Sequence, residues 1–128
     1  MITEDYVSFE TAKLLKEKGF DARCPMIYTA DGKLLYTDAK HHNMYAVTNK
    51  YLEYYTDIIA PSQTMAMKWL REEKHIFIEL LVDTMIKGAF TWRLFEYPSL
   101  EIMPYDGWEY TYEEACESAI KYCLKILI

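Results

Sequence analysis

The stretch that decides the fold is TYEEACESAIKYCLKILI, Thr111 to Ile128. Its apolar residues recur every three or four positions over about four helical turns, a spacing that predicts an amphipathic helix. Thr111 and Glu114 have the spacing of a capping box, which predicts where this helix begins. Such a helix must bury its apolar side, so the rest of the chain has to supply a layer beneath it. The apolar positions are Tyr112, Ala115, Cys116, Ala119, Ile120, Cys123, Leu124 and Leu127.

Two further helices are expected upstream. The range 8–18 begins with Ser8, a good N-cap, and ends before Gly19 and Phe20. Glycine takes the left-handed conformation after a helix, and an apolar residue behind it folds back on the last turn. The range 61–74 has a second helical stripe and starts at a proline. The stripe consists of Met65, Ala66, Trp69 and Leu70.

Between the first two helices, the sequence predicts a β-hairpin. The ranges 26–30 and 33–37 are rich in residues that favour strands. Asp31 and Gly32 lie between them, and this pair is typical of a two-residue hairpin turn. The range 38–48 has no periodicity and is expected to be a loop.

A second hairpin is expected after the second helix. The ranges 75–83 and 90–97 both alternate between apolar and other residues, as half-buried strands do. In the later range, one face holds Phe90, Trp92 and Leu94, and the other holds Thr91, Arg93, Phe95 and Tyr97.

Joined together, these elements predict an α+β fold in the order α-ββ-α-ββ-α. The expected architecture is one four-stranded, mainly antiparallel sheet from the two hairpins, with three helices packed mainly on one face.

The range 49–59 suits either a strand or a short helical turn. The range 98–110, with two prolines and Asp106-Gly107, is expected to be a loop. A length of 128 residues is typical of a single domain, 1–128.

Composition narrows the classes of function. The net charge of −6 makes nucleic-acid binding unlikely, because phosphate contacts require a surplus of Lys and Arg. The apolar runs are too short to cross a membrane, and the acidic start does not resemble a secretory signal. Three cysteines form no complete disulfide framework. We therefore expect a cytoplasmic protein.

Three stretches are familiar as a set: YVSFETAKLLKEKGFD (Tyr6 to Asp21), APSQTMAMKWLREEKHIFIEL (Ala60 to Leu80) and TYEEACESAIKYCLKIL (Thr111 to Leu127). Together they cover about half the chain, and APSQTMAMKWLRE is the most distinctive. They resemble a group of small, uncharacterised proteins carried by phages and prophage-like elements of gut bacteria. This resemblance implies a mobile-element origin and assigns no activity, cofactor or catalytic residue.

The search for catalytic or metal-binding patterns assigns no residue to either role. The glycines are scattered, and no phosphate-binding glycine loop or nucleophile elbow occurs. Asp38, His41 and His42 lie together, but adjacent histidines in an extended loop do not converge easily on one metal ion. No cofactor is implied. The rival hypothesis is a small enzyme with a pocket near the 38–48 loop, where His41 or His42 would meet Cys24 or Asp38.

Aromatic residues are unusually abundant, with 12 Tyr and 3 Trp. Such side chains either cover an open sheet face and loops, or form the centre of a protein interface. We predict a non-enzymatic binding module with an aromatic, acidic surface for a protein partner or for a second copy in a homodimer. The predicted surface is Trp92, Phe95, Tyr97, Trp108 and Tyr110.

A further alternative is an acidic mimic of nucleic acid that blocks a host protein. This hypothesis requires carboxylates aligned along one face at about the spacing of phosphates. The candidate clusters are Glu72 with Glu73, and Glu113 with Glu114 and Glu117.

Overall fold

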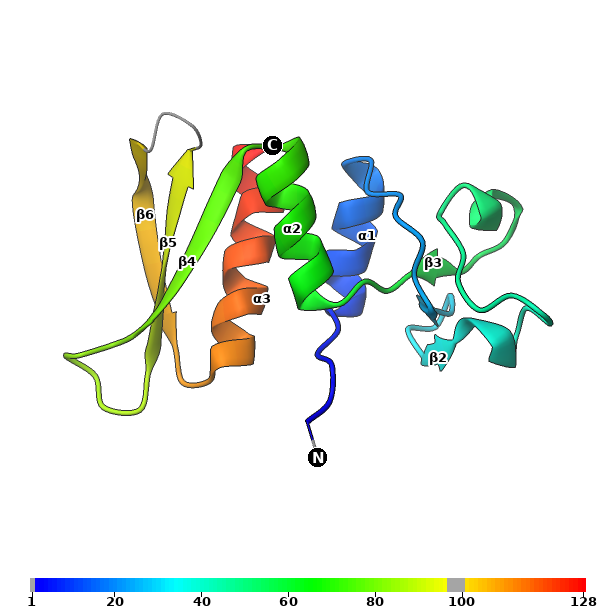
Figure 1. Ribbon diagram of the computed structural model, residues 1–128, viewed down its shortest axis with the longest axis horizontal. Coiled ribbons are helices and arrows are strands. Elements are labelled where there is room, and N and C mark those ends of the chain that lie inside the picture. Colours follow the sequence, from blue (N-terminus) through cyan, green and yellow to red (C-terminus); the bar gives the residue numbers. More distant parts are fainter. Residues whose placement is uncertain (1, 97–100) are drawn as a thin grey trace. The chain divides into compact units, whose positions relative to one another are not determined.

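The computed structural model describes residues 2–96 and 101–128, with the backbone alone between 101 and 106. The chain divides into two compact units, Met1–Ser62 and Gln63–Ile128. Each combines helix with a three-stranded antiparallel sheet, so the α+β class is confirmed (Figure 1). The expectation of one domain over 1–128 stays a prediction.

The first unit has one α-helix and a small sheet in the order β2-β1-β3. Helix α1 contacts β3, and its apolar side belongs to the core of this unit. The elements are α1 (Phe9–Glu17), β1 (Met26–Tyr28), β2 (Leu34–Tyr36) and β3 (Ile58–Ile59). Fully buried core residues include Val7, Leu15, Phe20, Ile27, Leu52 and Ile59.

Both predicted ends of α1 are confirmed. The hydroxyl of Ser8 accepts a hydrogen bond from the backbone N–H of Thr11 at 3.2 Å. At the other end, Gly19 has a φ of +94°. The backbone N–H of Phe20 donates to the carbonyl of Leu15 at 2.9 Å, as in a Schellman motif.

The first hairpin is confirmed, but its turn is longer than predicted. Thr29 N–H donates to the Lys33 carbonyl at 2.9 Å, and Gly32 N–H donates to the Thr29 carbonyl at 2.9 Å. Three residues, 30–32, therefore form the loop, with Gly32 at a φ of +83°. Three-residue loops of this kind place a left-handed residue last, so the glycine fits either turn length and the sequence does not distinguish them.

The segment between β2 and β3 is irregular and contains two short 3₁₀ helices, Thr37–Ala39 and Tyr51–Tyr54. Most of the range 38–48 is loop, as expected. In the range 49–59, both proposed structures occur in succession: a short helical turn, followed by β3 paired with β1.

The second unit contains two α-helices on one side of a sheet ordered β4-β5-β6 (Figure 1). Helix α2 contacts β4, and α3 contacts all three strands. The capping box is confirmed at the start of α3, where the Thr111 hydroxyl accepts from the Glu114 N–H at 3.0 Å. The elements are α2 (Gln63–Glu73), β4 (Ile76–Val82), β5 (Phe90–Glu96), β6 (Glu101–Glu109), α3 (Tyr112–Tyr122) and a π-helical turn (Cys123–Leu127) that continues α3.

The predicted single four-stranded sheet is wrong, because each hairpin belongs to its own three-stranded sheet. The two hairpins lie in different units, and each gains a third strand. In the first sheet this strand is β3, inside the range 49–59, for which a strand was one of the two expected structures. In the second it is β6, inside the range expected to be a loop.

Strand β6 was missed because its proline and glycine resemble turn signals. Pro104 is tolerated because β6 is an edge strand, where a missing N–H costs little. Gly107 lies directly opposite Trp92, and a Cβ atom there would be 2.6 Å from three atoms of the indole ring. The glycine therefore allows a close approach between strand and side chain, a second use of glycine within strands.

In the described part of the chain, none of the helices has both the length and the apolar character that crossing a bilayer requires.

Candidate functional site

The two faces of the second sheet differ in what covers them. Side chains alternate between faces along a strand, and directly opposite residues on neighbouring strands share a face. The face toward α2 and α3 holds the buried residues Ile76, Ile78, Trp92 and Leu94. We call the opposite side the open face, and define it by Phe77, Glu79, Leu81, Thr91, Arg93, Phe95 and Trp108.

Large apolar side chains stand at both ends of the open face. Phe77, Leu81 and Trp108 are 42%, 40% and 45% exposed, and Phe95 is half-buried. At one end, Phe77 lies directly opposite Phe95. At the other end, Leu81 lies opposite Thr91, which in turn lies opposite Trp108.

The middle of the open face is charged. Glu79 lies directly opposite Arg93, between the two apolar ends. Opposite charges at such cross-strand positions stabilise a sheet by about 0.2–1 kcal/mol. On its other side, Arg93 is paired with Asp106 of β6.

The structure brings together three of the five residues in the predicted surface. Phe95 and Trp108 both belong to the open face. Tyr110, just beyond the end of β6, is exposed and packs edge-on against Trp108, with ring centroids 5.1 Å apart. Trp92 instead points into the unit beneath α3, where its side chain is only 3% exposed. Tyr97 lies outside the described residues.

Phe77 and Leu81 complete the open face but were missed by the sequence analysis. A signal for both was present, because the 75–83 range alternates and one set of its residues must point away from the core. The sequence analysis did not place Phe77 and Leu81 beside Phe95, because the register between the two strands cannot be read from the sequence.

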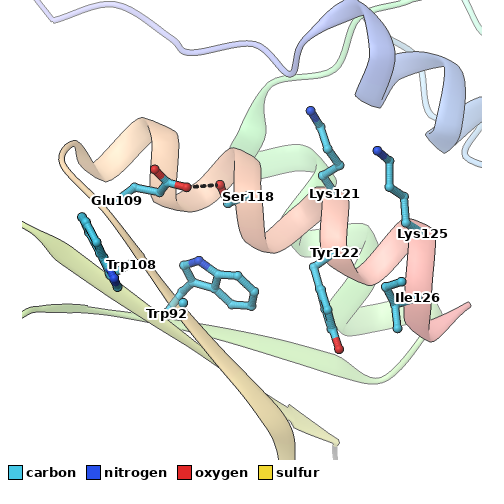
Figure 2. A pocket seen from close by; sticks show the side chains of 9 residues that line it. Trp92, Trp108, Glu109, Ser118, Lys121, Tyr122, Lys125 and Ile126 are labelled. Atoms are coloured by element: carbon cyan, nitrogen blue, oxygen red, sulfur yellow. Dashed lines mark hydrogen bonds between the residues drawn. The ribbon is translucent and has the colours of Figure 1, made fainter.

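A groove of about 360 Å³ lies between α3 and β6 (Figure 2). The Trp92 indole, which packs directly against Gly107, forms part of its lining. The Tyr122 ring packs against that indole, with centroids 5.8 Å apart. The remaining lining residues are Trp108, Glu109, Ser118, Lys121, Lys125 and Ile126.

Ser118 and two lysines of α3 supply polar groups at the groove. The Ser118 hydroxyl donates to a carboxylate oxygen of Glu109 at 2.8 Å. In Figure 2, the side chains of Lys121 and Lys125 extend from α3 on the side away from Trp92.

A buried cluster in the first unit surrounds the carboxylate of Asp57. Lys40 Nζ lies 2.8 Å from one carboxylate oxygen, and His41 Nε2 lies 3.1 Å from the other. Rings of Tyr51 and Tyr55 contact the imidazole edge-on, with centroids 5.7 and 4.8 Å away. Burial raises the pKa of the Asp57 carboxyl, but hydrogen bonds and charge from Lys40 and His41 outweigh it, so the net pKa is lowered.

This cluster connects the two ends of the irregular segment between residues 40 and 57. The predicted enzyme pocket required His41 or His42 beside Cys24 or Asp38. The structure instead brings His41 to Asp57, and both His42 and Asp38 are exposed. Burial raises the pKa of the Cys24 thiol to about 11, which is opposite to the shift of an activated thiolate.

No group of three or more His, Cys, Asp or Glu residues that could hold a metal occurs within 2–96 and 101–128. Comparison of the chain with protein-family models, with curated proteins and with solved structures finds no match. Function therefore has to be argued from the geometry of the open face, the groove and the Asp57 cluster.

Proposed function

We propose that this chain is a small, non-catalytic protein-binding module that uses the open face of its second sheet. The observation that carries this proposal is the asymmetry of that sheet. Two helices cover one face, while the other presents Phe77, Leu81, Phe95 and Trp108 partly exposed to solvent. Exposed apolar patches rimmed by polar residues mark interaction sites, and here two such patches flank the Glu79–Arg93 pair.

The composition of the open face resembles the centre of a protein interface. Aromatic residues and arginine are enriched at such centres, and Trp, Tyr and Arg account for most hot spots. Trp108 with Tyr110 and the Phe77–Phe95 pair supply the aromatic contact. Arg93, which is exposed, supplies the charged group.

The acidic-mimic alternative receives less support from the placement of its carboxylates. Helices α2 and α3 run parallel, because Gln63 near the start of α2 donates to the Glu113 carbonyl near the start of α3 (Figure 1). Glu72 and Glu73 lie at the far end of α2, whereas Glu113 and Glu114 lie at the start of α3. The two clusters are thus at opposite ends of the helix pair.

We also propose that the protein acts in the cytoplasm as an accessory protein of a phage or another mobile element. Cys24, Cys116 and Cys123 are all buried thiols, as expected in a reducing compartment. The mobile-element origin is supported by the sequence resemblance alone.

Site-specific photo-crosslinking in the natural host cell tests the open face. A photoreactive phenylalanine analogue replaces Phe77, and a matched control places the same group at Tyr54, an exposed aromatic residue of the first unit. We expect a discrete protein adduct from position 77 that weakens when Trp108→Ser is added. Crosslinking at position 77 no greater than at position 54 would contradict the proposed function.

A further inference from the structure

We propose that the partner of the open face is a second copy of this chain, packed sheet against sheet. This inference rests on the proposed function and names the partner for the same surface. It is carried by the order of residues across β4 and β5, which makes the open face complementary to itself.

Three rows of residues cross the strands of the open face. One apolar row contains Phe77 and Phe95, which is paired with Ile102 of β6. The middle row contains Glu79 and Arg93, and Arg93 is paired with Asp106 of β6. The third row runs from Leu81 through Thr91 to Trp108. An opposite charge pair is thus bounded on both sides by apolar residues.

Symmetry and charge together select one arrangement of two copies. Homodimers usually have a two-fold axis, so that the same patch is used on both subunits. An axis parallel to the strands, between β4 and β5, places Glu79 of each copy over Arg93 of the other. The same axis places Phe77 over Phe95 and aligns the strands of the two sheets, as aligned sheet packing requires.

Other two-fold axes are disfavoured by like charges. A two-fold axis that lies between the two sheets, perpendicular to the strands and level with the middle row, brings Glu79 of one copy over Glu79 of the other. The same axis brings the two copies of Arg93 together. An axis along β5 also brings the two arginines together. Facing like charges in an interface cost several kcal/mol, and this cost acts against the wrong arrangements.

The size of the open face limits the strength of the dimer. The proposed axis overlays β4 and β5 alone, and seven residues along each of these two strands span roughly 24 Å by 10 Å. This area is well below the roughly 800 Å² that each partner buries in a standard interface, and the net charge of −6 on each copy opposes association. We therefore expect a weak, concentration-dependent dimer that is populated only toward millimolar concentrations.

Complementary charge variants of the full-length chain test this arrangement. In Glu79→Arg, positions 79 and 93 are both positive, and in Arg93→Glu both are negative. Each variant alone should weaken dimerisation at least tenfold in sedimentation equilibrium. An equimolar mixture of the two should associate again, because each positive face then meets a negative one.

Two matched controls test whether a charge change must lie on the open face to weaken the dimer. Glu72→Arg and Arg71→Glu make the same charge changes on the exposed side of α2 and should leave the dimer unchanged. Circular dichroism and urea unfolding of every variant establish that the monomers are folded.

Two results would overturn the second copy as partner. One is a wild-type chain that stays monomeric up to millimolar concentration, and the other is a mixture that fails to associate although both variants are folded. A crosslink from position 77 to a different protein, combined with a monomeric purified chain, would also overturn it while leaving the proposed function supported.

Discussion

At the scale of single residues, Gly107 shows how a tertiary contact can require a glycine within a strand. It lies opposite Trp92 in the sheet, and its missing side chain leaves room for the indole. Both residues also belong to the lining of the groove between α3 and β6. A glycine that resembles a turn signal in the sequence is thus required by a tertiary contact.

Replacing Gly107 with alanine should destabilise the protein by about 1–3 kcal/mol, the usual cost of overpacking a rigid site. The new Cβ would approach the Trp92 indole to 2.6 Å, and this ring is buried. Urea unfolding measures the change. In a Trp92→Phe background the ring is smaller, so the same substitution should cost less, and equal costs in both backgrounds would contradict the close-contact explanation.

Asp57 should make the stability of the first unit depend on pH in the acidic range. Its pKa is lowered in the folded state, so the carboxylate contributes stability above about pH 4. This contribution is lost as the pH falls through the folded-state pKa. Asp57→Asn should therefore lower the free energy of unfolding at neutral pH by about 1–3 kcal/mol, and the difference from wild type should shrink below about pH 4.

Urea unfolding at several pH values tests the role of Asp57. Asp38→Asn is the matched control, because Asp38 is exposed in the same irregular segment. We expect this control to leave both the stability at neutral pH and its acid dependence close to wild type. If the difference in free energy of unfolding between Asp57→Asn and wild type stays constant under acid conditions, the stabilising role of the Asp57 carboxylate is contradicted.

At the scale of elements, the helices are specified locally and their ends can be tested directly. The Thr111 hydroxyl accepts from the Glu114 N–H and donates to the Glu114 carboxylate at 2.9 Å. Thr111→Ala removes both bonds and should cost about 0.5–2 kcal/mol in urea unfolding. Thr111→Ser keeps the hydroxyl and should restore most of that loss. If serine and alanine were equally destabilising, the cap would not be the cause.

The strands were harder to predict than the helices, for a physical reason. The ends of α1 and α3 depend on residues within four positions, so Ser8, Gly19 and Thr111 show them in the sequence. Strand β3 has only two residues and exists through its pairing with β1. Strand β6 contains a proline and a glycine that are acceptable only at this edge and over this indole.

At the scale of the whole molecule, the domain count can be tested through the core of the first unit. Leu52 is fully buried there, so Leu52→Ala should cost about 2–5 kcal/mol. If residues 1–128 form one domain, as the sequence analysis predicts, the loss should appear equally in the most protected amides of both units. Hydrogen exchange measures this, and loss of protection confined to the residues up to 62 would contradict a single domain.

What the sequence by itself determined is the set of α-helices and the two hairpins. Helical periodicity, caps and hairpin turns act between neighbours along the chain, so they can be recognised without coordinates. Only the tertiary structure decided which strands share a sheet and that Trp92 is buried while Phe77 joins Phe95. These properties depend on register and on contacts between residues far apart in sequence, and a local pattern does not contain that information.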